Sequence, residues 1–371
     1  MYYFLFCISA FVLIYYGKIK NGKNPFCYFV TFMVIAVGVF RGEYIGTDIM
    51  PVGGGSYYDL WRSPFSDDRI EKGFVWLTYI LRNMIDSYHF YYGAIYALNM
   101  YFYYLAVKRM KLNVSVFFAI LLLSSTFYPS FNTIRQQLGL SIGVYLFSLL
   151  IYNPCNGYSL KKNIILYELG IFLLFLFSHH GLFILAIVPL FLMTPIQKVL
   201  NKDIALWSLL AATVVIIQFF GQYIQMAIIA LNGVVSLGDR ADFYANLVEN
   251  YGDNIEASRG ILSTIINGSL AILISRNKRN FLFYIGFVGL LLSSLGSVNL
   301  GTVGRIFANV DFFMCLYFTS VWFDMDTSFK PCGRLQVFAL KSLRLLFWGT
   351  SFYFTIVQNE SISPYKTFLF E

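Results

Sequence analysis

Residues 164–197 read IILYELGIFLLFLFSHHGLFILAIVPLFLMTPIQ. The stretch holds two long apolar runs, 164–178 and 182–197, on either side of His179, His180 and Gly181. A helix needs about 20 mostly apolar residues to cross the hydrocarbon core of a bilayer, and backbone polar groups in lipid must bond internally. The stretch therefore predicts two membrane helices joined by a polar turn.

The composition extends this interpretation to the whole chain. Of the 371 residues, 58% are hydrophobic and only 12% are charged, whereas a soluble domain carries about 25% charged residues. The mean hydropathy is +0.65. Such a chain cannot cover a water-exposed surface, which excludes an ordinary globular enzyme, a disordered protein and a coiled coil.

Further apolar runs of similar kind follow one another along the chain, and their continuity predicts helices rather than the alternating strands of a membrane barrel. The runs lie near 2–16, 26–40, 88–107, 113–128, 135–152, 164–178, 182–197, 204–227, 260–275, 281–298, 305–323 and 341–357. We therefore predict an all-α, polytopic integral membrane protein with about 12 transmembrane helices. It forms one domain over residues 1–371, with outer loops near 41–87 and 231–259.

Basic residues mark the loops expected on the cytoplasmic side. They are Lys18, Lys20, Lys23, Lys108, Arg109, Lys111, Lys161, Lys162, Lys198, Lys202, Arg276, Lys278, Arg279, Lys330, Arg334, Lys341 and Arg344. Both termini then lie outside, and the segment 73–86 must not cross the membrane. We predict an interfacial or re-entrant helix there, on the outer side. The net charge of +8 is explained by these anchors, and no nucleic-acid partner is expected.

Four separate segments place cationic or proton-carrying groups at the outer membrane boundary: Arg41, Arg135, Arg305, and the pair His179 and His180. Any one Arg can be a headgroup anchor, and the His pair can be satisfied at the interface. Together they run against the positive-inside bias. Arg offers a planar fork for bidentate phosphate contacts, so the set suits a lipid-linked diphosphate.

Acid–base candidates are Asp48, Glu71, His179 and His180. A glycosyl transfer needs a base for the attacking hydroxyl, and a His near its free pKa of about 6.5 suits that task. Asp48 also fits a turn or helix cap. The aromatic pair Tyr57 and Tyr58 lies in the first outer loop, where it fits a sugar groove or an interfacial aromatic belt. The five cysteines show no paired spacing, so neither a zinc site nor a disulfide framework is indicated.

At these residues the chain resembles the EpsG-like group of Wzy-type polysaccharide polymerases. The resemblance lies in VFRGEYIGTDIM (39–50) with Tyr57 and Tyr58 after it, in Glu71 with Gly73 and Phe74, in FNTIRQQLGLSIG (131–143), and in FSHHGLFI (177–184). GRIFANVDFF (304–313) is a looser match. Gly181 and Leu182 replace a family Ser and Ala, so no hydroxyl role is carried over to these positions.

The resemblance implies a metal-independent glycosyltransferase without cofactors. It would join oligosaccharide repeat units carried on undecaprenyl diphosphate, at the outer face of the bacterial inner membrane, for O-antigen, capsule or exopolysaccharide. Arg135, Arg305 and Arg41 would hold the diphosphate, and Tyr57, Tyr58 and Gln136 would contact sugar. His179 or His180 would be the base, with Asp48 and Glu71 orienting sugars or serving as alternate bases. Expected partners are membrane lipids, a chain-length regulator and a flippase.

Three alternatives remain open. The chain could be another polyprenyl-phosphate-dependent glycosyltransferase, a glycan acyltransferase, or a flippase for the same lipid-linked oligosaccharide. A one-sugar transferase would give no ladder of products. A flippase would line a central passage with its charges, whereas the residues singled out here gather at one boundary.

Overall fold

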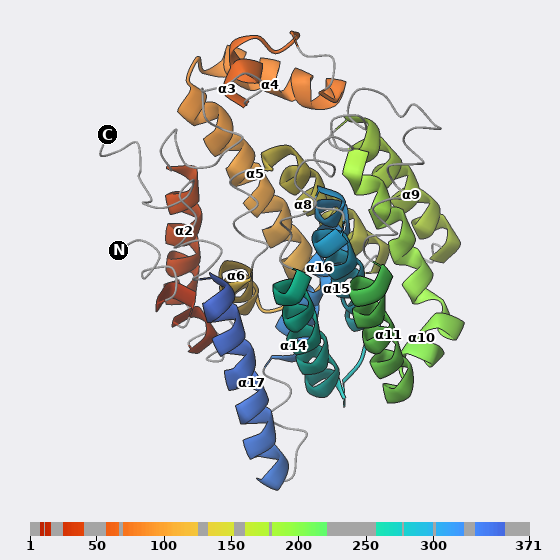
Figure 1. Ribbon diagram of the computed structural model, residues 1–371. Helices are drawn as coiled ribbons and strands as arrows, with labels where there is room; N and C mark the ends of the chain where they lie inside the picture. The colour runs from red at the N-terminus through yellow and green to blue at the C-terminus, as the bar shows by residue number, and fades with distance from the viewer. Residues whose placement is uncertain are drawn as a thin grey trace, which may run out of the picture. The chain divides into compact units, whose positions relative to one another are not determined.

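The computed structural model describes residues 8–10, 12–15, 25–40, 57–66, 70–124, 133–151, 160–177, 180–220, 257–276, 278–299, 302–322 and 331–352. Every regular element in these residues is a helix (Figure 1). They are α2 (Pro25–Val39), α3 (Tyr57–Arg62), α4 (Lys72–Met84), α5 (Tyr88–Arg109), α6 (Val114–Leu123), α8 (Ile134–Ile151), α9 (Leu160–Phe177), η2 (His180–Leu192), α10 (Thr194–Leu200), α11 (Asp203–Val215), η3 (Ile216–Phe220), α14 (Ala257–Ser275), α15 (Phe281–Asn299), α16 (Thr302–Val321) and α17 (Pro331–Phe352). The predicted all-α class is confirmed for this part of the chain.

The number of membrane spans is established only in part. By length and composition, two described helices can cross a bilayer, Ile134–Ile151 and Asp203–Phe220, and a bent pair can make a third. Shorter apolar helices are Val114–Leu123, Ile261–Ser275, Phe281–Gly296 and Phe307–Val321. The structure therefore confirms that the described predicted spans are helical. It does not confirm that there are about 12 of them.

The predicted span 182–197 is interrupted. The structure has a 3₁₀ helix up to Leu192, and α10 starts at Thr194 after a bend of 88°. Pro195 lies in the first turn of α10, where its missing N–H leaves no bond unmade. Further inside a helix its ring would clash with the preceding turn, so the break falls just before it.

Packing divides the chain into two compact units. The first holds Met1–Ala186, Phe318–Thr327 and Ser342–Glu371, and the second holds Ile187–Tyr317 and Ser328–Lys341. The prediction of one membrane domain over 1–371 stays a prediction.

In the first unit α5 and α8 run in the same direction. Arg135, in the first turn of α8, interacts electrostatically with Tyr91, in the first turn of α5. Further along both helices, the rings of Phe102 and Tyr145 are 5.8 Å apart. The starts of the two helices therefore lie at one end of the unit, and the last turn of α5, with its basic residues, lies at the other.

Helices α2 and α9 run the opposite way and end where α5 and α8 begin. A Cβ at Gly93, early in α5, would be 3.2 Å from the carbonyl oxygen of Val39, the last residue of α2. In α9, Tyr167 faces Phe147 of α8 at 6.3 Å, whereas the later Leu174 lies close to Gly143. The last turns of α2 and α9 and the first turns of α5 and α8 therefore lie at the same end of the unit.

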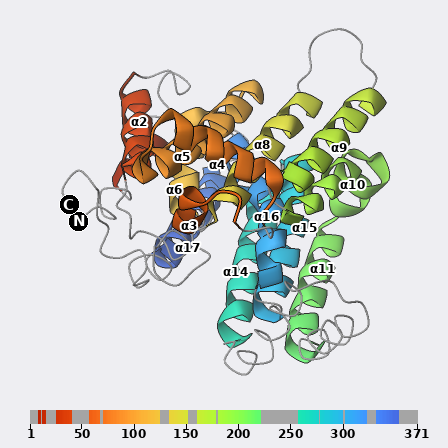
Figure 2. The same cartoon turned by 90° about the horizontal axis from the view of Figure 1, so that it is seen from above.

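The short helices α3 and α4 lie across the end at which α5 begins (Figures 1 and 2). A buried aliphatic and aromatic cluster fastens them to α5 and α8. It consists of Tyr57, Leu60, Phe74, Val75, Leu81, Tyr88, Tyr91, Tyr92, Ile95, Ile134 and Leu138. Aromatic residues bury large areas and pack edge to face. This cluster therefore holds α3 and α4 firmly against the first turns of α5 and α8.

The second unit contains α11, α14, α15 and the first part of α16. Its loops are joined by Arg279, which pairs with Asp203 and donates at 2.7 Å to the carbonyl of Asn201. Tyr284 also donates to the Asn201 side chain at 3.3 Å. These bonds connect the turn before α11 to the turn before α15.

Arg344 shows how a charged side chain is accommodated inside a helix. The sequence placed Arg344 among the cytoplasmic basic residues, whereas the structure puts it in the middle of α17, 4% exposed. Its guanidinium carbon is 4.8 Å from the ring centre of Phe318 and 4.7 Å from that of Trp348. Aromatic faces attract a cation when water is excluded, which explains how a charge is accommodated there.

Candidate functional site

The site is built around an ion pair between Glu71 and Arg135, two residues that lie 64 positions apart in the chain. Nη1 of Arg135 donates a hydrogen bond to Oε2 of Glu71. The Glu71 side chain is 0% exposed and that of Arg135 is 16% exposed. An isolated buried charge is very costly unless it is paired, so each of these residues requires the other.

Both residues are positioned by helix starts. Glu71 is the N-cap of α4, and its carbonyl accepts from the backbone N–H groups of Phe74 and Val75 at 2.9 and 3.1 Å. Arg135 is the second residue of α8. A helix N-terminus favours an anion and disfavours a cation. Glu71 is therefore at a favourable position, whereas Arg135 is held against the dipole of its own helix.

A shell of aromatic and hydroxyl groups fixes the Arg135 guanidinium. The hydroxyl of Tyr57 makes a side-chain hydrogen bond to Arg135, and the ring centre of Phe74 is 5.9 Å from the guanidinium carbon. Next to them, Tyr91 and Thr78 bond through their hydroxyls at 3.0 Å. Groups from α3, α4 and α5 thus surround a cation supplied by α8.

The proposed sugar-contacting residues lie in different surroundings. Tyr57 is buried and turned toward Arg135. Tyr58 is half-buried and packs edge to face on Tyr88, with ring centres 5.1 Å apart. Gln136 is buried at the start of α8. A role for these three residues in sugar binding stays a prediction.

For five other predicted site residues the structure allows little or no comparison. Arg41, Asp48 and His179 lie outside the described residues. Position 180 begins η2 and position 305 lies in the first turn of α16, but both side chains lie outside the described part. Position 180 follows the end of α9, at the end of the first unit that also carries Arg135. The second unit holds position 305, so its proximity to Arg135 stays a prediction.

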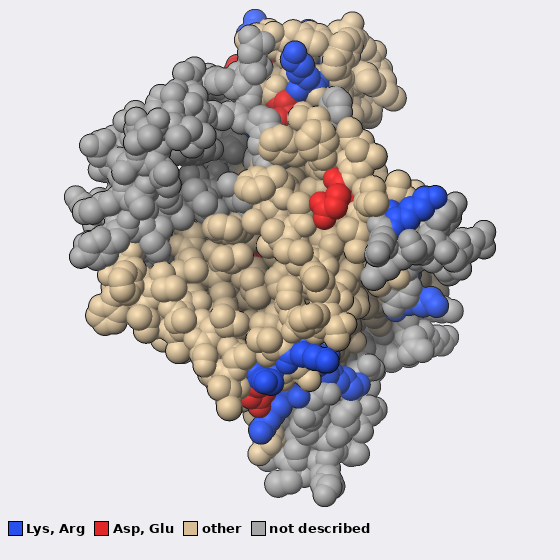
Figure 3. Space-filling view, turned by 90° about the vertical axis from the view of Figure 1, so that its right-hand side faces the viewer, with Lys and Arg blue, Asp and Glu red and all other residues tan. Residues whose placement is uncertain are grey.

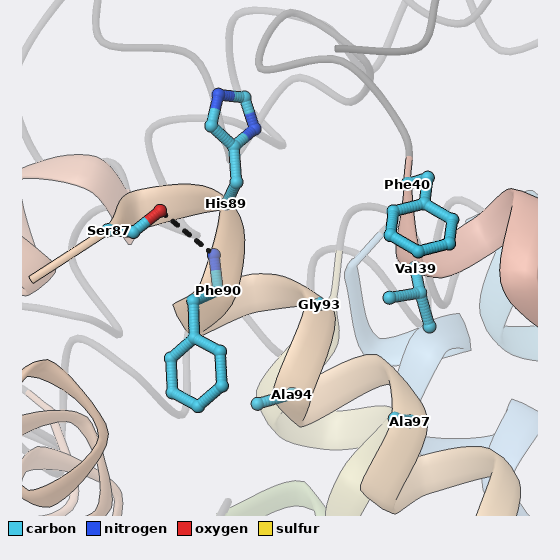
Figure 4. A pocket seen from close by; sticks show the side chains of 8 residues that line it. All are labelled: Val39, Phe40, Ser87, His89, Phe90, Gly93, Ala94 and Ala97. Carbon is cyan, nitrogen blue, oxygen red and sulfur yellow. Dashed lines mark hydrogen bonds between the residues drawn. The ribbon is translucent and has the colours of Figure 1, made fainter. Parts of the chain in front are cut away.

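Sequence reasoning missed His89, which stands beside a cavity of about 480 Å³ at the start of α5 (Figure 4). Its Nδ1 is 2.7 Å from the hydroxyl of Tyr92. The cavity is lined by Val39, Phe40, Ser87, His89, Phe90, Gly93, Ala94 and Ala97. The signal in the sequence is weak: His89 is one of three histidines and opens a predicted span on the outer side, but it stands alone, without the spacing pattern of a site.

Comparison with known families identifies the chain. The sequence profile of the EpsG family matches residues 23–367. The chain belongs to the EpsG family. This confirms the resemblance found in the sequence motifs. No curated protein and no solved structure matches it.

EpsG membership and the apolar helices together indicate a membrane protein, and the family indicates a Wzy-like polymerase kind of function. Within this EpsG chain, the described residues contain no group of three or more His, Cys, Asp or Glu that could hold a metal ion. What they do contain is a preorganised cation. A guanidinium held in place by a carboxylate and a phenol is a preorganised binding group for an anionic ligand.

Proposed function

We propose that the protein is a polymerase that joins undecaprenyl-diphosphate-linked oligosaccharide repeat units. The reaction takes place at the outer face of the bacterial inner membrane, in the synthesis of O-antigen, capsule or exopolysaccharide. The growing chain moves from its lipid carrier to the nonreducing sugar of the incoming unit. The observation that supports this proposal is the buried Glu71–Arg135 pair at one end of the helices.

The position of that end along the unit supports an outer-face site. The last turn of α5 carries Lys108 and Arg109, and Lys162, in the first turn of α9, is exposed. Both turns lie at the end opposite to Arg135. Because basic residues favour the cytoplasmic side, Arg135 then faces outward, where a lipid-linked oligosaccharide is polymerised.

Arg135 would bind the donor diphosphate and offset the negative charge that develops on the leaving group. Arg305 and Arg41 would contribute to the same task. His179 or His180 would take the proton of the attacking sugar hydroxyl, with Asp48 as the alternate base. Tyr58 and Gln136 would contact the sugars.

For Glu71 the burial favours a positioning role over that of a base. Its carboxylate is fully enclosed and occupied by Arg135, so it has no path to a sugar hydroxyl. We assign it the task of holding Arg135 in the orientation that receives the diphosphate. Tyr57 shares this task through its bond to the same guanidinium.

Replacing Arg135 tests the proposal. We expect Arg135→Ala to slow polymerisation by about 100- to 1000-fold, because one preorganised charge-stabilising donor is lost. The assay uses the full chain in liposomes with the lipid-linked repeat unit of its own cells, and reads the ladder of products on a gel. Arg276→Ala is the matched control, since that Arg is 71% exposed and is expected to leave the ladder unchanged. A normal ladder from Arg135→Ala would refute the role.

The role of Glu71 needs a readout that separates positioning from proton transfer. We expect Glu71→Gln to lower the rate while the acid limb of the pH–rate profile is retained. The double variant Glu71→Ala, Arg135→Ala should be no slower than Arg135→Ala alone, since the two residues act as one unit. Loss of the acid limb in Glu71→Gln would instead identify Glu71 as the base.

A further inference from the structure

Helix α4 is apolar on two faces. One face is buried against the rest of the first unit and comprises Phe74, Val75, Thr78 and Leu81. The other comprises Trp76, Tyr79, Ile80 and Met84, which are between 41% and 66% exposed. An ordinary surface helix has one apolar stripe and a polar opposite face. The second apolar face of α4 therefore indicates that this helix contacts an apolar surface outside the unit.

The exposed face is extended by a residue from the preceding turn. The ring of Phe65 lies 5.4 Å from Trp76 and 5.4 Å from Tyr79, and Trp76 and Tyr79 are 5.8 Å apart. We call Phe65, Trp76, Tyr79, Ile80 and Met84 the exposed aromatic face. Contiguous apolar patches of this kind are rare on surfaces that face water.

The length of α4 excludes a crossing of the membrane. It has 13 residues, which span about 20 Å at 1.5 Å per residue, whereas the hydrocarbon core is about 30 Å thick. The helix also lies across the end of the first unit (Figures 1 and 2). It therefore lies at the level where the long helices begin.

The exposed aromatic face continues a surface that is suited to lipid. Helix α4 packs against α9, and α9 exposes an apolar stripe formed by Ile165, Leu169, Phe172 and Leu176. In Figure 3 most of the described surface is uncharged, with an acidic group near its middle and the basic groups toward its edges. Trp and Tyr are enriched at the level of lipid headgroups, which favours a bilayer surface over a protein as the neighbour of α4.

We propose that α4 lies in the membrane surface, with the exposed aromatic face inserted between the headgroups and the upper acyl chains. Lys72 is exposed at the start of the helix, and its long side chain would reach the headgroups. Because Glu71 caps α4 and pairs with Arg135, this seating sets the depth of Arg135 relative to the lipid. The seating of α4 on lipid holds whether or not the chain polymerises glycans.

Fluorine NMR on the full chain in nanodiscs tests the proposal. The five tryptophans are labelled as 5-fluorotryptophan, and the Trp76 signal is assigned by its loss in Trp76→Phe. The probes are a lipid with a nitroxide at acyl carbon 5, a lipid with a nitroxide at carbon 16, and a water-soluble gadolinium chelate. We expect the carbon-5 lipid to broaden the Trp76 signal most strongly. Trp61 serves as an internal comparison, because its ring packs 5.7 Å from both Tyr58 and Tyr88, and it should be broadened less.

Each other result overturns the proposal in a distinct way. Strongest broadening by the chelate would place Trp76 in water. Strongest broadening by the carbon-16 lipid would place it deep in the bilayer. No broadening by any probe would show that protein covers the face.

A pair of substitutions on one turn gives a matched control. Ile80→Asp puts a carboxylate on the exposed aromatic face, whereas Asn83→Asp puts one at an exposed position that is already polar. We expect Ile80→Asp to reduce the carbon-5 broadening of Trp76 at least twofold and Asn83→Asp to leave it unchanged. Equal effects of the two variants would contradict a lipid contact through this face.

Discussion

Thr78 and Tyr91 show how single hydroxyl groups stabilise the site. Thr78 Oγ1 donates to the carbonyl of Phe74 at 3.0 Å, so its only proton is already used. The Tyr91 hydroxyl, 3.0 Å away, must then be the donor of the shared bond. The charge of Arg135 acts on the same Tyr91 hydroxyl.

We expect Tyr91→Phe and Thr78→Val each to lower the free energy of unfolding by about 1 kcal/mol, because each removes a buried hydrogen bond. The double variant should cost less than the two single costs added, since both break the same bond. Denaturation of the purified chain in detergent measures these differences. Thr350→Val is the control, because Thr350 is exposed and bonds only to a carbonyl of its own helix among the bonds described. Strict additivity of Tyr91→Phe and Thr78→Val would contradict the shared bond.

At the scale of elements, α15 and α16 approach each other through glycines. A Cβ at Gly286 would lie 2.7 Å from the Cα of Met314, and one at Gly289 would lie 2.7 Å from the carbonyl oxygen of Val310. Small residues allow membrane helices to approach until their backbones touch. Any side chain at these two positions would push the helices apart, because the obstacle is backbone rather than a flexible side chain.

We therefore expect Gly286→Ala and Gly289→Ala each to destabilise the protein by about 1 to 3 kcal/mol, the usual cost of overpacking. Gly349→Ala in α17 is the matched control, since a Cβ there meets nothing within 4 Å. Ala is the better helix former by about 1 kcal/mol, so that variant should be neutral or slightly stabilising. Thermal unfolding in detergent ranks the three proteins. A Gly286→Ala protein as stable as Gly349→Ala would show that α15 and α16 are not in backbone contact.

At the scale of the whole molecule, the charge distribution predicts the orientation in the membrane. In the first unit, Arg135 and α4 lie at one end of the helices, and Lys108 lies in the last turn of α5 at the other end. If the positive-inside rule holds for this chain, the two ends face different compartments.

Cysteine labelling tests this orientation. We expect a membrane-impermeant maleimide to label Asn83→Cys in right-side-out vesicles and to label Lys108→Cys only after permeabilisation. Both positions are exposed, so access to the compartment decides the result. The unsubstituted chain gives the background of its five native cysteines. Labelling of both positions without permeabilisation would contradict the topology.

Predictions from the sequence were most accurate for properties that depend on neighbouring residues in the chain. The helix at 73–86 was expected from its short apolar run with Arg82 inside it, and the structure has α4 at Lys72–Met84. The break inside the predicted span 182–197 was not anticipated, because hydropathy averages over the turn at Met193 while Pro195 sets the boundary of α10. His89 was missed, because a lone His in an aromatic run has no spacing pattern that distinguishes it.

The amino-acid sequence by itself determined a helical membrane protein of the EpsG family, because apolar content and short motifs are properties of contiguous residues. Only the tertiary structure decided that Glu71 pairs with Arg135 and that Tyr57 turns inward to the same guanidinium while Tyr58 packs on Tyr88. These contacts depend on how α3, α4, α5 and α8 pack against one another. Helical periodicity shows which residues share a face of one helix, but it carries no information about which other helix that face will meet.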